Sequence, residues 1–181
     1  LPGLRGSSES EEKTQPPWSA VRYSSMSSRT ELFVHLVWRT RLSQTWITPE
    51  ISHVLSRYVA WRSRRLGCEL LAFGSAPDHV HLAIRLHPAV SVAAVAKDIK
   101  GASSHHLNHH CVQPGHPRMT WQTGYGAFTF GKSEIPVVTR YIESHEGRHA
   151  RQAVVESWER VPAPDNGAVS APGESAHARD A

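Results

Sequence analysis

The sequence predicts an α+β fold in which one antiparallel sheet packs against helices. Short segments rich in β-branched and aromatic residues alternate with longer segments whose apolar residues recur every three or four positions. Their order along the chain is strand, helix, strand, strand, helix, strand, followed by a last helix. The first six elements match the split β-α-β pattern of ferredoxin-like folds, and no internal repeat is visible.

The first half of this pattern has clear boundaries. A strand is predicted over residues 31–38, which are dense in β-forming side chains. Thr48 offers a helix N-cap and Pro49 suits the first helical position, so a helix is expected from there to about Gly67. Two further strands, over residues 68–74 and 77–84, are close enough in sequence to predict a hairpin.

The second half is less regular. A helix is predicted over residues 90–100, and its continuation to Leu107 is left open. After a loop rich in His, Pro and Gly, residues 121–130 are predicted to form short strand segments that glycines interrupt. A last helix is expected over residues 133–146, where Gly147 can close it.

Composition divides the chain into one domain and two tails. Residues 1–28 are rich in Ser, Glu, Pro and Gly without an apolar period, so they are predicted to be a disordered leader. Residues 29–151 form the predicted domain, and residues 152–181 a largely disordered extension. Met26 stands just before the first ordered segment and is a candidate natural start.

Charge and cysteine usage narrow the class of protein. Between Met26 and Arg151 there are 15 Lys or Arg against 8 Asp or Glu, a net charge of +7, so the domain is the cationic part and a polyanion is a plausible partner. Cys68 and Cys111 are too few for a disulfide framework. No apolar run reaches membrane-spanning length, so we expect a soluble, cytoplasmic protein with no membrane partner.

Two histidines on the predicted strand 77–84 are candidate metal ligands. Side chains alternate along a strand, so His79 and His81 project from the same face. The alternative is that they lie on the polar face of a half-buried strand and bind no metal. On the last helix, Tyr141 and His145 are one turn apart and would point together, which couples a candidate nucleophile to a candidate third ligand. Tyr141 could equally be a packing residue with a wetted hydroxyl.

Several blocks of the sequence, taken together and in the same order, resemble the single-tyrosine HUH transposases. Within that group the chain is most similar to the REP-associated tyrosine transposases of the insertion-sequence-200-like superfamily, over about residues 29–151. The blocks are the two-histidine strand, Phe33–Thr40, Lys100–Ser104, Trp121–Phe128 and Tyr141–Ile142.

The resemblance implies a role for each matching residue. His79 and His81 would hold Mg²⁺ or Mn²⁺, and Tyr141 would attack a DNA phosphodiester to form a covalent 5′-phosphotyrosine. Family members carry a Gln one turn after the tyrosine as the last metal ligand, and His145 stands at that position here. Mn²⁺ accepts imidazole ligands, whereas Mg²⁺ prefers oxygen.

The resemblance also implies the substrate and the assembly. The substrate would be single-stranded DNA whose inverted repeats fold into hairpins, and the protein would be a homodimer. Basic and aromatic residues are candidates for DNA contacts, against the alternative of solvated surface cations and core aromatics. The candidates are Arg39, Arg41, Arg62, Arg64, Arg65, Lys97, Lys100 and Trp121, with Trp46 as a further stacking surface.

Two other functions stay open from the sequence. One is a catalytically silent nucleic-acid-binding module that keeps the fold and the basic surface; the change to His145 favours it, and the intact Tyr141 argues against it. The other is a metal-dependent phosphoesterase in which water attacks instead of a tyrosine.

Overall fold

The computed structural model describes residues 29–112 and 115–144. The two predicted tails and the end of the predicted domain, residues 145–151, lie outside the described residues. The elements in chain order are β1 (Phe33–Arg39), α1 (Pro49–Arg65), β2 (Glu69–Ala76), β3 (His79–Arg85), α2 (Val92–His110), β4 (Gly126–Phe130) and α3 (Ile135–Glu143). This confirms the predicted order of strands and helices.

The element boundaries differ from the prediction mainly in the second half of the chain. Helix α2 continues past Leu107 to His110, so the continuation left open by the sequence is real. Helix α3 begins at Ile135, after a single 3-10 turn over Lys132–Glu134. It is described as far as Glu143, and the predicted end of the helix at Glu146 and its terminator Gly147 lie outside the described residues.

The four strands form one antiparallel sheet in the order β2-β3-β1-β4. Strand β3 is antiparallel to both β1 and β2, so β1 and β2 run parallel with β3 between them. That is the split β-α-β arrangement, and it confirms the ferredoxin-like prediction. The two-histidine strand is therefore an inner strand, in which both backbone edges are hydrogen-bonded.

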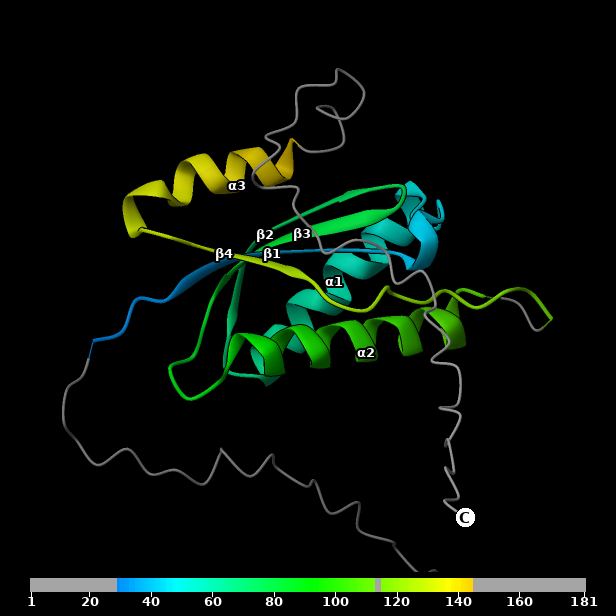
Figure 1. The fold of residues 1–181 in the computed structure, drawn as a ribbon, viewed down its shortest axis with the longest axis horizontal. Coiled ribbons are helices and arrows are strands. Elements are labelled where there is room, and N and C mark those ends of the chain that lie inside the picture. Colours follow the sequence, from blue (N-terminus) through cyan, green and yellow to red (C-terminus); the bar gives the residue numbers. More distant parts are fainter. Residues whose placement is uncertain (1–28, 113–114, 145–181) are drawn as a thin grey trace, which may run out of the picture.

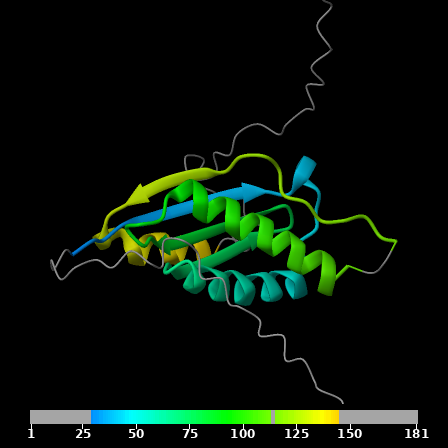
Figure 2. The same cartoon turned by 90° about the horizontal axis from the view of Figure 1, so that it is seen from below.

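Helices cover both faces of the sheet, as Figure 1 shows with α3 on one side and α1 and α2 on the other. The larger core lies under α1 and α2, where β1 contributes Leu36 and Trp38 and β3 contributes Leu82. In Figure 2 these two helices run beside each other across that face. The opposite face has a smaller cluster in which α3 packs on Ala72 of β2 and Ala83 of β3.

Because both faces are covered, β1 is buried along nearly its whole length, from Phe33 to Trp38.

Helix α1 starts as predicted, with the Thr48 hydroxyl accepting the Ile51 N–H at 3.3 Å. Within the described ranges, no helix combines the length and apolar character needed to cross a membrane.

Candidate active site

The two histidines of β3 lie on the sheet face that α3 covers. Their side chains are 1% and 0% exposed for His79 and His81, and their ring centres lie 5.2 Å apart. The next residue in this row, Ala83, packs against α3. The structure therefore confirms that His79 and His81 share a face, and it shows that this face is an interior one.

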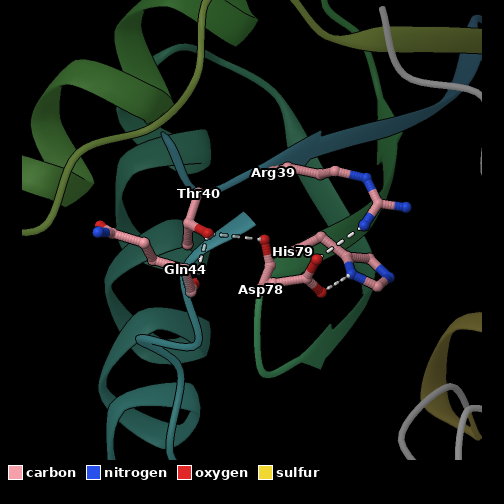
Figure 3. A network of polar contacts seen from close by, with 5 residues as sticks. All are labelled: Arg39, Thr40, Gln44, Asp78 and His79. Atoms are coloured by element: carbon pink, nitrogen blue, oxygen red, sulfur yellow. Dashed lines mark hydrogen bonds and ion pairs between the residues drawn. The ribbon is translucent and has the colours of Figure 1, made fainter. Parts of the chain in front are cut away.

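Asp78 holds His79 from the turn that precedes β3. One carboxylate oxygen lies 2.5 Å from His79 Nδ1, and the other accepts a hydrogen bond from Arg39 Nη1 at 2.7 Å (Figure 3). Burial alone would raise the pKa of Asp78, but the hydrogen bond with His79 and the charge of Arg39 outweigh it and lower the pKa below its usual value. An ionised Asp78 can only accept, so His79 Nδ1 carries the proton and donates.

The backbone of Asp78 is fixed as firmly as its side chain. Its carbonyl oxygen accepts the N–H of Thr40 at 2.7 Å and the hydroxyl of Thr40 at 3.1 Å. The same hydroxyl lies 2.6 Å from the carbonyl oxygen of Gln44 (Figure 3). The end of β1 thus anchors the turn that orients His79.

His35, on β1, contacts His81 in the same interior layer. The distance from His35 Nε2 to His81 Nδ1 is 2.8 Å, and His35 is 2% exposed. In the sheet register His35 lies opposite Ala83, while Val37 lies opposite His81, so the two histidines are diagonal neighbours across β1 and β3. Phe128 of β4 packs on the other side of His35, with ring centres 5.8 Å apart.

Tyr141 reaches this layer from α3. It is 3% exposed, and its ring centre lies 6.2 Å from that of His81 and 6.5 Å from that of His35, edge-on to both. Tyr141 is therefore a buried residue, and its role as a nucleophile rather than a packing residue stays a prediction. The structure brings Tyr141 and His81 of the same chain into one buried cluster.

A close approach of α3 to the sheet sets the position of Tyr141. Gly74 of β2 lies opposite His81, and a Cβ atom there would collide with the backbone carbonyl of Ile142. The glycine is therefore required for the last turn of α3 to lie directly on β2. Val138 and Ile142 complete the apolar contact on either side of Tyr141.

Four of the predicted DNA-contact residues lie at the end of the sheet where β1 finishes. Arg39 is bound to Asp78, and Arg41 is exposed in the loop that follows. The ammonium group of Lys100 donates to the carbonyl oxygens of Gln122 and Gly124 at 2.8 and 2.5 Å, and burial lowers its pKa. Trp121 donates its indole N–H to Ser103 at 3.0 Å and packs edge-on against Trp38.

The other four candidates lie on α1 and α2, the helices of the opposite face, and α2 also carries Lys100. Arg62 of α1 makes a two-point ion pair with Asp98 of α2, at 2.5 and 2.7 Å. Arg64, Arg65 and Lys97 are exposed, and the Arg65 guanidinium lies over the ring of Trp61. The structure does not bring this group together with His79, His81 and Tyr141, and a DNA role for any of the eight candidates stays a prediction.

The third predicted ligand, His145, lies outside the described residues. Within residues 29–112 and 115–144, no group of three or more His, Cys, Asp or Glu side chains converges as a metal site. Metal-binding histidines usually have their second ring nitrogen hydrogen-bonded to a neighbouring side chain. Here Asp78 contacts Nδ1 of His79, and His35 contacts Nδ1 of His81. Two imidazoles suit a divalent transition-metal ion chemically, and its binding at His79 and His81 stays a prediction.

Sequence reasoning did not assign a role to His35 or Asp78. A signal existed for each: His35 is the single polar residue within the apolar run Phe33–Trp38, and Asp78 directly precedes His79. A buried polar residue in an apolar strand needs a partner, but the partner depends on strand pairing that the sequence does not reveal.

This fold recurs in solved structures of other proteins. The crystal structure of a protein from Deinococcus radiodurans, assigned as a transposase, superposes with a TM-score of 0.53 at 25% identity, covering 68% of this chain and 97% of that chain. The family model described as "Transposase IS200 like" matches residues 28–145. The chain belongs to the IS200-like transposase family.

Two further relatives are similar to this chain. The ISDra2 transposase TnpA of Deinococcus radiodurans is 22% identical over 126 residues, which cover 65% of this chain and 86% of the relative. The structure of a REP-associated tyrosine transposase bound to a REP hairpin has a TM-score of 0.50 at 15% identity. That match covers 72% of this chain and 76% of the other, and it shows likeness of fold.

Proposed function

We propose that this chain is an active single-strand DNA transposase of the REP-associated tyrosine type, with Tyr141 as its nucleophile. The observation that supports this most is the contact of Tyr141 with His81, whose ring centres lie 6.2 Å apart in one chain. Membership of the transposase family supplies the class of reaction, and the buried cluster supplies a nucleophile beside two candidate metal ligands.

In the proposed reaction the Tyr141 oxygen attacks a phosphorus atom of the DNA backbone. As the phenol gives up its proton to solvent, a bond forms from the tyrosine oxygen to phosphorus, so that Tyr141 carries the 5′-phosphate end of the strand downstream of the cut. The bond from phosphorus to the 3′ oxygen breaks, and that oxygen leaves as a hydroxyl after taking up a proton. A second 3′-hydroxyl then attacks the phosphotyrosine, which rejoins the DNA and restores the phenol. One phosphodiester replaces another at each step, so no nucleotide hydrolysis is needed.

His79 and His81 are proposed to hold a divalent ion, Mg²⁺ or Mn²⁺, through their Nε2 atoms. Asp78 and His35 fix the two Nδ1 atoms and so set the orientation of each ring. A bound ion would polarise the scissile phosphate, which a phenol with an ordinary pKa near 10 requires for attack at neutral pH. His145 as third ligand is part of this proposal. Two or three imidazoles suit Mn²⁺ better than Mg²⁺.

The proposed substrate is single-stranded DNA with hairpin-forming repeats, because a solved structure of similar fold holds a REP hairpin. Arg39 and Arg41 lie at the end of the sheet nearest His79 and are the basic candidates best placed for the cleaved strand. A homodimer is proposed in which each chain supplies its own Tyr141 to its own His81.

The test is to incubate the full chain with hairpin-bearing single-stranded DNA and Mn²⁺ or Mg²⁺, then to look for a protein–DNA adduct that survives denaturation. We expect an adduct from the unmodified chain, none from Tyr141→Phe, and an unchanged yield from Tyr125→Phe, whose ring packs in the core on the other face of the sheet. An adduct that survives Tyr141→Phe would overturn the assignment of the nucleophile.

Two other outcomes identify the alternative functions. Hairpin binding without cleavage in either metal would indicate a silent binding module. Cleavage without any adduct would indicate a phosphoesterase that uses water. A mixture of Tyr141→Phe and His81→Ala chains tests how the dimer is built: it forms no adduct if each site is completed within one chain, and it forms one if the sites are shared.

A further inference from the structure

The last turns of α2 carry four histidines that the transposase site does not use. His105 and His106 lie one helical turn before His109 and His110. The ring centres of His105 and His109 are 4.2 Å apart, and those of His106 and His110 are 4.6 Å apart. Helix α2 covers the sheet face opposite α3, so these rings belong to a different surface from His79 and His81 (Figure 1).

We propose that the two pairs, His105 with His109 and His106 with His110, form a binding site for borderline divalent transition metals such as Zn²⁺, Ni²⁺ or Cu²⁺. Residues four apart on a helix lie one above the other, so one nitrogen of each ring can reach the same ion. Imidazole suits these metals, whereas Mg²⁺ selects oxygen ligands. Each pair would supply two ligands, and water would complete the coordination.

The surroundings of the pairs favour a bound cation. Both lie at the C-terminal end of a 19-residue helix, where the helix dipole stabilises positive charge. His105, His109 and His110 are exposed, so an ion can reach them from solvent. His106 is half-buried and its ring stacks on Tyr58 of α1 at 4.2 Å between ring centres, which restricts the rotation of one ligand before any ion binds.

An ion bound at these pairs would stabilise the last turns of α2 and the chain segment around Met119 that α2 contacts. The side chain of Asn108, which lies between the pairs, accepts the Met119 N–H and donates to the Met119 carbonyl oxygen, both at 2.8 Å. Met119 is buried in the core and lies just before Trp121, where the chain returns to the end of β1. Since the ion binds the folded helix better than the unfolded chain, it should raise the unfolding temperature.

The test uses the untagged full chain carrying Cys111→Ser, because Cys111 is exposed next to His110 and its thiol would also bind these metals. Zn²⁺ is titrated by calorimetry, and Cu²⁺ is followed by electron paramagnetic resonance, which reports the number of bound nitrogens. Two double variants each remove one pair: the first carries His105→Gln and His109→Gln, and the second carries His106→Gln and His110→Gln. A third variant removes all four rings, and Mg²⁺ serves as the control metal.

His53→Gln is the matched control for losing one exposed helical imidazole. His53 lies on α1 with Pro49 and Arg57 one turn away, so it has no histidine partner on its helix face. Removing both rings of a pair should weaken Zn²⁺ binding there by about tenfold or more, since no two imidazoles are then held side by side at that position. Circular dichroism checks that each variant keeps its helices.

We expect each pair variant to lose one Zn²⁺ site and part of the rise in unfolding temperature that Zn²⁺ causes. His53→Gln should keep both sites and the full rise. Mg²⁺ should neither bind at the pairs nor raise the unfolding temperature. The Cu²⁺ spectrum should show two nitrogens at each pair. Equal Zn²⁺ binding by the unmodified chain and the four-ring variant would overturn the proposal, as would equal losses in His53→Gln and the pair variants. DNA cleavage is not read out, so the outcome is independent of the proposed function.

Discussion

His35 Nε2 and His81 Nδ1 lie 2.8 Å apart in the interior of the sheet, on two neighbouring strands. If His81 binds a metal through Nε2, its Nδ1 carries the proton and donates to His35 Nε2. This fixes His35 as the tautomer protonated at Nδ1. Under that proposal the contact sets both the tautomer and the orientation of His81, and it gives His35, the buried polar residue of β1, a proposed role.

We predict that His35→Leu weakens Mn²⁺ binding by about 10- to 100-fold, because loss of a partner of a metal-binding histidine typically has an effect of this size. His35→Gln should restore part of the affinity, since its amide can still meet His81 Nδ1. Calorimetric titration with Mn²⁺ measures both. Leu36→Met, on the other face of the same strand, is the control. Equal Mn²⁺ affinity in His35→Leu and Leu36→Met would contradict the role of His35.

Asp78→Asn should weaken Mn²⁺ binding to a similar extent, again about 10- to 100-fold. The amide has nearly the shape of the carboxylate, but it lacks the charge that holds both the His79 ring and Arg39. Asp98→Asn is the matched control, because it removes a carboxylate from the ion pair with Arg62 on the far face and leaves the site untouched. If Asp98→Asn weakens Mn²⁺ binding as much as Asp78→Asn, the effect is not local to the site.

Gly74→Ala should separate the tyrosine from the histidines without changing either. The added methyl group collides with the Ile142 carbonyl and forces the end of α3 away from β2, at a cost of roughly 1–3 kcal/mol in the free energy of unfolding. Adduct formation should fall more than Mn²⁺ affinity does, because His79 and His81 stay on β3. Denaturant unfolding and the adduct assay measure the two effects.

Gly101→Ala is the control for that substitution. Gly101 lies within α2, and a Cβ atom there meets nothing within 4 Å, so alanine should stabilise the helix by about 0.5–1 kcal/mol. Adduct formation should not change. A loss of adduct in Gly101→Ala equal to that in Gly74→Ala would show that α3 is not positioned as described.

The fold was predictable because local patterns agreed with the final arrangement. Thr48 and Pro49 marked the start of α1, and the short link between residues 74 and 77 predicted the hairpin that β2 and β3 form. The predicted end of α3 near Gly147 lies outside the described residues, in which α3 runs as far as Glu143.

The site was predictable only in part, because one of its members, His35, acquires its meaning from strand pairing. The spacing of His79 and His81 follows from strand geometry and needs no tertiary information. His35 becomes relevant only when β1 pairs with β3 in the register that sets Val37 opposite His81. The basic residues show the same limit, since nothing in the sequence places Arg39 beside the site and Arg62 on the far face.

The central claim is that Tyr141 becomes covalently joined to DNA, and locating the attached nucleotide by mass spectrometry tests it most directly. The adduct formed on hairpin-bearing single-stranded DNA is digested with nuclease and protease, and the modified peptide is sequenced. The account predicts a 5′-phosphate-linked nucleotide on Tyr141. A nucleotide on any other residue, or cleaved DNA with no modified peptide, would contradict it.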